Sequence, residues 1–342
     1  MKTWLTVAVL ITAVAAAWGQ AQEDAGRIER HDPAVDAVLA PDARLELLAG
    51  HLGMTEGPLW IDDAAGGHLL FSDIPANAIY KWTPDGELSV HMEEAGYTGD
   101  DILNAGAQST SGRRHIILIG PNGLTLDPQG RLLIAAMADR AVVRIEADGS
   151  RTVLADRFDG QRLNGPNDLV ARASGAIFFT DMTAGMRYRG DSPSRELFHT
   201  GVYRIKDGEL TLVEADPGGG SPNGIALSPD ERTLYVGSGG KILAYDLDAD
   251  DNASGGRVLI ETSSDGMKVD EQGNLYTTSH GGVWIISPEG KHLGTIHLPD
   301  ILGVRTTNVG FGDADRQSLY ITARTHLYRI RVEIPGARPG GA

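Results

Sequence analysis

A repeating pattern of short apolar runs and polar turns covers most of the chain. Each copy starts with small polar residues, continues with an apolar run, turns at Asp, Pro, Gly or Asn, and ends in a second β-rich run. Most copies follow one another at the roughly 40–50 residues of a propeller blade. Two more strand-like runs follow each of the first five copies, with period-two alternation and no amphipathic helix, which predicts an all-β chain. The six copies begin at Thr55, Gly120, Gly165, Ser221, Ser264 and Thr307.

The pattern predicts a six-bladed β-propeller with four-stranded blades, as a single domain over residues 44–332. The sixth copy is followed by only one further strand, so we expect the N-terminal segment 44–50 to supply its fourth strand and close the ring. Such a closure leaves no open sheet edge. Residues 22–43 are predicted to form a loose polar leader, and residues 333–342 a flexible C-terminal tail.

Residues 1–21 are typical of a signal peptide. Lys2 precedes an apolar run from Thr3 to Trp18, and small residues near Gly19 fit a cleavage site. The run of about 15 residues is shorter than the roughly 20 that span a bilayer, which favours cleavage over a membrane anchor. We therefore expect a secreted or periplasmic protein with no membrane association after cleavage.

Composition narrows the class of protein. A chain of 342 residues that is 41% hydrophobic has enough apolar material for a large core, and its 44 Gly suit many tight turns. A net charge of −16 without a Lys/Arg cluster argues against nucleic-acid binding. The absence of Cys excludes disulfides, thiolate metal sites and cysteine nucleophiles. We expect a monomer that binds a small molecule.

One polar residue recurs at the start of the first strand in every copy. The first strand of each blade lines the channel of a propeller, so these residues are expected to form a ring at one mouth. Their oxygen atoms and two carboxylates suit Ca²⁺, with Mg²⁺, Mn²⁺ and Zn²⁺ as alternatives. Asn and Asp are also ordinary turn residues, but six of them in phase favour a binding site. The ring consists of Glu56, Asn122, Asn167, Asn223, Asp265 and Asn308.

The loops between the second and third strands are expected on the same face as this ring. Two segments break the repeat length, residues 93–119 and 182–200, and we expect the second to cover part of the site. Together with two ring amides, the loops supply the predicted substrate-binding residues, which are Asn122, Arg140, Asp181, His280, Asn308 and Arg324.

The motifs TEGPLW, NGLTLDPQGRLL, LNGPNDLV, SPNGIALSPDERTLYV and DGMKVDEQGNLY occur in one order over about residues 50–325. In these motifs the sequence resembles the SMP-30/gluconolactonase/luciferin-regenerating-enzyme family. The resemblance implies a six-bladed propeller with a divalent ion, usually Ca²⁺, in the channel mouth. It implies Glu56, Asn167, Asn223 and Asp265 as metal ligands, with Asp265 also as the catalytic base or nucleophile.

The family resemblance implies a metal-dependent hydrolase that opens a sugar-type lactone. Two segments depart from lactonase-like relatives, AAMADRA at 135–141 and FTDMTAG at 179–185, and both are expected to face the mouth. The metal ligands are retained while the substrate wall is altered. Two alternatives stay open: a metal-dependent esterase or phosphotriesterase-like hydrolase, and a secreted propeller that binds a ligand without catalysis.

Overall fold

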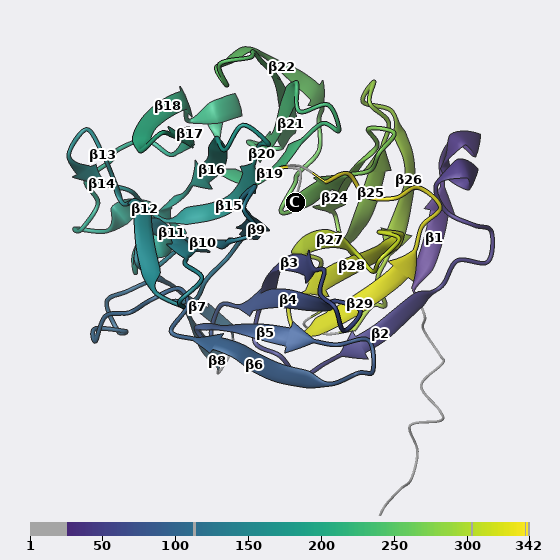
Figure 1. Cartoon of the computed structure of the whole chain (residues 1–342), viewed down its shortest axis with the longest axis horizontal. Coiled ribbons are helices and arrows are strands. Elements are labelled where there is room, and N and C mark those ends of the chain that lie inside the picture. Colours follow the sequence, from purple (N-terminus) through teal and green to yellow (C-terminus); the bar gives the residue numbers. More distant parts are fainter. Residues whose placement is uncertain (1–25, 112–113, 302–303, 339, 341–342) are drawn as a thin grey trace, which may run out of the picture.

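The protein is a six-bladed β-propeller whose blades surround a central channel (Figure 1). This computed structural model describes residues 26–111, 114–301, 304–338 and 340. The predicted signal peptide lies outside the described residues. Within the described part of the chain, every helix is too short to cross a bilayer.

Each blade is an antiparallel sheet of four strands in chain order from the channel outward, except that the last blade takes its outer strand from the N-terminus. The innermost strands are β3 (Thr55–Ile61), β9 (Leu124–Leu126), β15 (Pro166–Ala171), β19 (Pro222–Leu227), β23 (Met267–Val269) and β27 (Asn308–Gly312). The second strands are β4 (His68–Asp73), β10 (Leu132–Ala136), β16 (Ile177–Asp181), β20 (Thr233–Ser238), β24 (Leu275–Ser279) and β28 (Ser318–Ala323). The third strands are β5 (Ala78–Trp82), β11 (Ala141–Ile145), β17 (Gly201–Lys206), β21 (Lys241–Leu247), β25 (Gly282–Ile286) and β29 (His326–Arg331). The outer strands are β6 (Leu88–Glu93), β12 (Arg151–Ala155), β18 (Glu209–Ala215), β22 (Ala253–Ile260), β26 (His292–His297) and β2 (Leu45–Ala49).

The aspartates of the repeat fix the turns between first and second strands. Asp127 accepts hydrogen bonds from the backbone N–H groups of Gln129 and Arg131, at 3.0 and 2.9 Å. In the fifth blade, Asp270 accepts hydrogen bonds from the backbone N–H groups of Gln272 and Asn274 in the same way. Such Asx turns make the chain reverse where the repeat requires it.

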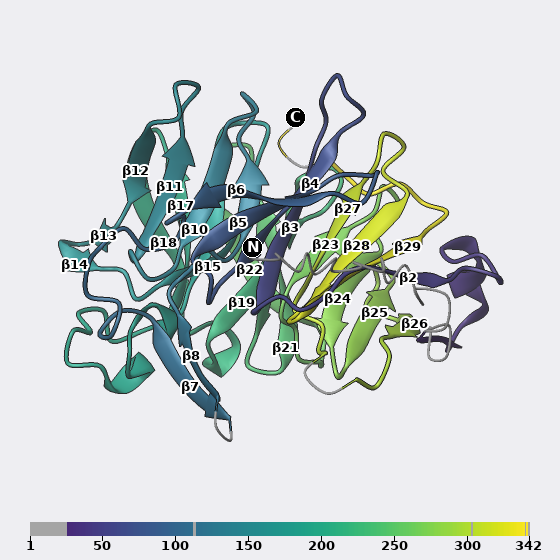
Figure 2. The ribbon, with the colours of Figure 1, turned by 90° about the horizontal axis from the view of Figure 1, so that it is seen from below.

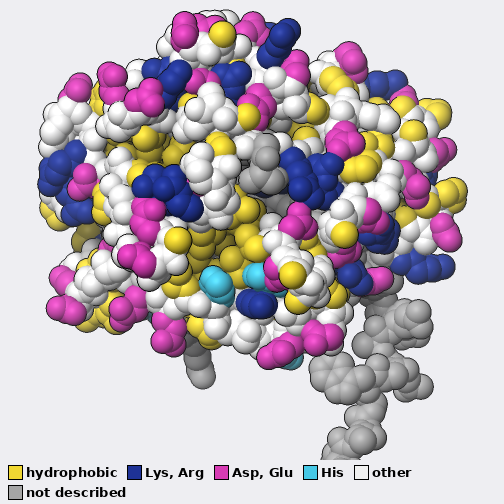
Figure 3. Space-filling view, viewed as in Figure 1, with side chains coloured by type: hydrophobic (Ala, Val, Ile, Leu, Met, Phe, Trp, Pro, Cys, Tyr) yellow, Lys and Arg dark blue, Asp and Glu magenta, His cyan; other side chains and the backbone are white. Residues whose placement is uncertain are grey.

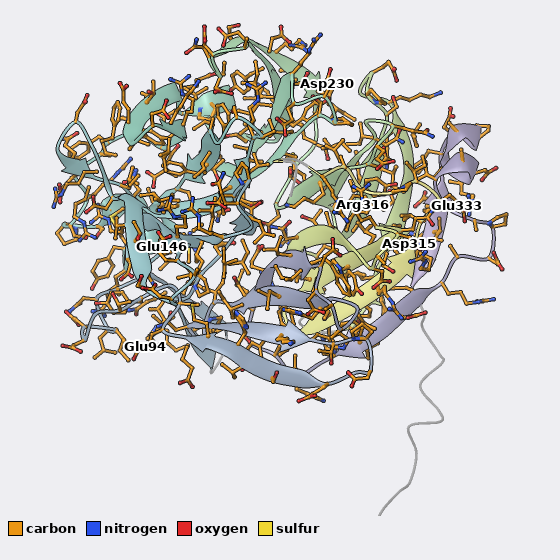
Figure 4. All side chains as sticks on the ribbon, in the orientation of Figure 1. Glu94, Glu146, Asp230, Asp315, Arg316 and Glu333 are labelled. Carbon is orange, nitrogen blue, oxygen red and sulfur yellow. The ribbon has the colours of Figure 1, made fainter. Side chains whose placement is uncertain are left out.

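Six apolar clusters hold the blades together, one at each interface between neighbours. Leu133 of the second blade packs in one cluster with Phe179 of the third, for example, and both are fully buried. Burying each such side chain contributes about 1.5–3 kcal/mol. Side chains fill the spaces between the ribbons of adjacent blades (Figure 4).

The ring closes as predicted, because β2 pairs with β29 and completes the sixth blade. The predicted loose leader is wrong, however. Residues of β1 (Arg27–Arg30) pair with β26 as a fifth strand of the fifth blade. The 3₁₀ helix η1 (Pro33–Ala37) follows, and Val35 and Leu39 are fully buried against blades 5 and 6. The leader is ordered because these apolar side chains and an open sheet edge stabilise each other.

Residues 333–338 of the predicted C-terminal tail pack on the propeller. From Glu333 near the rim, the C-terminal segment runs inward past Arg316 (Figures 1 and 4). Ile334 is buried in the cluster between blades 5 and 6, and Ala337 donates its N–H to Val269 O at 2.9 Å. The tail is thus packed across the face of the propeller where the innermost strands end.

The two faces of the propeller differ, as the side view shows (Figure 2). One face carries the C-terminus. The opposite face carries a hairpin of β7 (Ala107–Ser111) and β8 (Arg114–Leu118), which the 93–119 insertion forms. The remaining short elements are the hairpin of β13 (Arg157–Phe158) and β14 (Gln161–Arg162), and the 3₁₀ turns η2 (Thr183–Gly185), η3 (Arg189–Asp191) and η4 (Pro217–Gly219).

Candidate metal and substrate site

The six predicted ring residues lie at the starts of the innermost strands, on the face opposite the C-terminus. Glu56, Asn122, Asn167 and Asn308 are buried, with 2–5% of each side chain exposed, whereas Asn223 and Asp265 are partly exposed. The glycine after Asp265 lets neighbouring strands approach, because a Cβ on Gly266 would lie 2.0 Å from Asn308 Cγ. The ring is therefore compact.

Two methionine sulfurs orient ring amides. Asn167 Nδ2 donates to Met182 Sδ at 3.1 Å, and Asn122 Nδ2 lies 4.0 Å from Met137 Sδ. Asn122 Oδ1 is buried and has no hydrogen-bond partner among the described residues. A buried carbonyl oxygen without a partner is costly, so this atom is suited to a ligand.

Asn308 has a different role from the other ring amides. Its Nδ2 donates to Glu56 Oε2 at 3.1 Å and to Asp168 Oδ2 at 3.3 Å, and its Oδ1 accepts the N–H of Val309 at 2.9 Å. These protein contacts occupy both ends of the amide. In this structure Asn308 is a bridge between two carboxylates, and its predicted contact with substrate stays a prediction.

Asp168 is a site residue that the sequence analysis missed. Its side chain is only 1% exposed and accepts the N–H of Leu169 at 2.9 Å. Four other copies of the repeat have glycine at this position, and a Cβ on Gly123 would lie 2.4 Å from Asp168 Oδ1. The carboxylate thus occupies space that a neighbouring glycine leaves, and the break in the glycine pattern was the signal.

Glu56, Asp168 and Asp265 bring three carboxylates close together, and their mutual repulsion disfavours the ionised forms. Burial, and then the charges of Asp265 and Asp168, raise the pKa of Glu56 well above its ordinary value. Burial likewise raises the pKa of Asp265, although a hydrogen bond from Asn223 and the charge of Arg305 act against it. Buried anions without a cationic partner favour either protonation or a bound cation.

The oxygen donors fit a divalent ion. The described residues contain no group of three or more His, Cys, Asp or Glu arranged for a metal, so the fit depends on amide oxygens as well as carboxylates. Carboxylates of Glu56 and Asp265 with amide oxygens of Asn167 and Asn223 form the hard donor set that Ca²⁺ takes. The unpartnered Asn122 Oδ1 adds a fifth candidate oxygen.

Two of the predicted substrate residues are buried in structural contacts. Arg140, 5% exposed, donates to the backbone oxygens of Leu163, Ser194 and Arg162 at 2.5, 3.0 and 3.3 Å. Asp181 is fully buried and accepts three hydrogen bonds from Asn164 and Gly165. Arg140 and Asp181 thus hold neighbouring backbone in place, and their predicted contact with substrate stays a prediction.

Three exposed side chains remain available around the mouth. His280 and Arg324 occupy tight turns with positive φ, at 41° and 51°. Arg305, which sequence reasoning missed, is also exposed, and both arginines act to lower the pKa of Asp265. The two arginines give the mouth local positive charge in an otherwise acidic protein.

The two insertions pack against each other on this face. Gly106 N donates to Gly185 O at 3.2 Å, and Arg187 Nη1 donates to Asn104 Oδ1 at 2.9 Å. An apolar cluster that includes Ile74, Ala107, Leu118, Met137 and Ala184 lies beneath them. The altered segments noted in the sequence thus build one continuous wall beside the ring.

Residues 54–325 match the family model for the SMP-30/gluconolactonase/LRE-like region. The chain belongs to this family. It is 34% identical over 328 residues to a gluconolactonase of Zymomonas mobilis, covering 91% of this chain and 87% of the relative.

Two solved structures show the same fold. A gluconolactonase from Xanthomonas campestris is 31% identical, with a TM-score of 0.73 over 89% of this chain and 94% of that one. A calcium-binding regucalcin from Agrobacterium tumefaciens has a TM-score of 0.63 over 86% of this chain and 97% of that one. Its 21% identity makes this a likeness of fold alone.

Proposed function

We propose that this protein is a divalent-metal-dependent lactonase that opens a sugar-type lactone at the channel mouth. The observation that carries the proposal is the ring of buried Glu56, partly exposed Asp265 and amide oxygens, in a chain related to gluconolactonases. The hard oxygen donors favour Ca²⁺. We further propose that the mature protein is secreted or periplasmic, on the basis of its N-terminal segment. We also propose that it is a monomer.

Lactone opening adds water to the carbonyl carbon and breaks the bond from that carbon to the ring oxygen. When bound, a divalent ion supplies Lewis-acid polarisation of the carbonyl. The Asp265 carboxylate, which is partly exposed at the mouth, takes a proton from the attacking water. The same proton is returned to the ring oxygen, which leaves as a hydroxyl group.

Other residues of the chain support this reaction. Asn308 fixes the Glu56 carboxylate through its amide N–H, and the methionine contact fixes the Asn167 amide. Arg305 and Arg324 attract the hydroxy-acid product, which is an anion. The apolar wall formed by the two insertions limits how much water reaches the ring on that side.

The experiment measures hydrolysis of a panel of sugar lactones by the purified mature chain, with and without a chelator. Chelation should abolish turnover and Ca²⁺ should restore it. Equal or faster turnover of aryl esters or organophosphates would favour the alternative hydrolase. Binding of lactones with no turnover of any substrate would favour a non-catalytic propeller.

Asp265→Asn isolates the proposed base. The amide keeps an oxygen for the ion but cannot take a proton, so turnover at saturating Ca²⁺ should fall at least about 100-fold. Asp148→Asn, in an exposed hairpin turn, is the matched control. Near wild-type turnover by Asp265→Asn would show that this carboxylate is not the base.

A further inference from the structure

Lys268 lies in the channel on the side of the ring away from the mouth. Its neighbours in β23, Met267 and Val269, are buried in the core between blades 4 and 5. Lys268 instead lines a cavity of about 420 Å³ together with Pro58, Leu124 and Gly310. Apolar patches and Lys/Arg side chains lie around the centre of this face (Figure 3).

The level of Lys268 follows from the strands. Pro58, Leu124 and Gly310 each stand two residues after a ring residue on the same innermost strand. Lys268 stands three residues after Asp265, which is about 10 Å along an extended strand. Its backbone therefore lies beneath the ring, and its ammonium lies beside Met267 O, two residues after Asp265.

Lys268 differs from the other cations of this cavity. Arg316 pairs with Glu271, and Arg338 pairs with Asp62 at 2.8 Å. Lys268 Nζ donates to Met267 O at 3.1 Å and, among the described residues, has no carboxylate oxygen within 4.0 Å. Its charge is thus not taken up by a local ion pair.

The ring provides the charge that Lys268 complements. Asn308 bridges Glu56 and Asp168, at 3.1 and 3.3 Å, and Gly266 packs directly against Asn308, so the carboxylates of Glu56 and Asp168 lie beside the Asp265 end of the ring. Three ionised carboxylates carry −3, and a divalent ion would supply +2. Arg305 and Arg324 are exposed at the mouth, where water screens their charge, so the buried side of the ring keeps one negative charge.

We propose that Lys268 is the internal counter-ion of the metal ring, a positioning residue that neutralises the one negative charge a divalent ion leaves. The inference rests on the proposed metal dependence. This role predicts a direction of change that a structural role does not. The ammonium repels the divalent ion, so removing the charge of Lys268 should strengthen metal binding. In the ion-free protein, the charge of Lys268 compensates one of the carboxylate charges and so stabilises the fold.

The test measures Ca²⁺ affinity by isothermal titration calorimetry of the full mature chain. By Coulomb's law with an effective dielectric constant of about 20, a unit charge about 10 Å from a divalent ion changes affinity by well over tenfold. Water in the channel weakens this effect, so Lys268→Met and Lys268→Gln should bind Ca²⁺ at least about tenfold more tightly. Lys268→Arg keeps the charge and should bind as wild type does. Lys81→Met, at a half-buried lysine of the first blade, is the matched control.

Thermal unfolding gives a second readout. The neutral variants should be less stable than wild type without Ca²⁺ and should gain more from adding it. Unchanged or weaker Ca²⁺ binding by both neutral variants, beside normal binding by wild type, would overturn this inference alone. Absence of Ca²⁺ binding by wild type would overturn the proposed metal dependence and this inference with it.

Discussion

Arg140 offers a direct test of how the insertions are held. Its guanidinium makes three hydrogen bonds to backbone oxygens of the β13–β14 region and the 182–200 insertion. Burial lowers its pKa to about 10, so it stays charged at neutral pH. Hydrogen bonds from charged donors contribute roughly 1.5–3 kcal/mol each, offset in part by the cost of burying the charge. Arg140→Met should therefore lower the free energy of unfolding by about 3 kcal/mol.

Thermal or urea unfolding measures this loss, which corresponds to a melting point lower by roughly 5–10 °C. Arg144→Met is the control, because it removes an arginine of the same strand that pairs with Glu146 in a half-exposed site. Such pairs contribute about 0–1 kcal/mol. A variant with the wild-type melting point and a KM raised more than tenfold would refute the structural role and favour substrate binding by Arg140.

Two further predictions concern stability. Ending the chain after Glu333 removes the buried Ile334 and the backbone hydrogen bonds of the tail, which should lower the free energy of unfolding by about 3–5 kcal/mol. The value of kcat/KM should not change, because the tail lies on the face opposite the ring. An unchanged melting point would mean that the tail does not pack on the propeller. Burial raises the pKa of Asp181 from 3.8 to about 6. The folded state therefore binds a proton at Asp181 more tightly than the unfolded chain does. The ionised carboxylate lowers the free energy of unfolding above pH 6, and this loss is recovered as the pH falls towards 4. The free energy of unfolding of wild type minus that of Asp181→Asn should therefore rise by about 2–3 kcal/mol from pH 7 to pH 4, and a flat difference would contradict the assignment.

The fold was predictable because every blade repeats the same apolar spacing and the same turn residues. The closure by β2 followed from a missing strand in the last copy. The strand β1 was not predictable, because its sequence RIER has no alternation of apolar and polar residues, as is common at sheet edges.

The ring was predictable for the same reason, since Glu56 and Asp265 align with the amides of other copies. Which way each amide points was not, because Met137 and Met182 belong to the departures from the family pattern and reach the ring only after the insertions fold. The contact of Arg140 with Ser194 depends on the 182–200 insertion too. Asp168 and Lys268 were not predictable from the repeat, because neither occupies the position that recurs in all six copies.

The two strands at the N-terminus have a consequence for how the chain folds. Glu29 of β1 and His297 are 268 residues apart, and Glu46 of β2 and Arg329 are 283 residues apart. Contacts this distant in sequence form slowly, because the loop-closure entropy precedes any gain from pairing. Thus β1 stays unpaired until the fifth blade has formed, and β2 until the sixth has formed. A chain that crosses a membrane N-terminus first would stay open and unfolded in transit, and once closed, both joints must part before the ring can unravel.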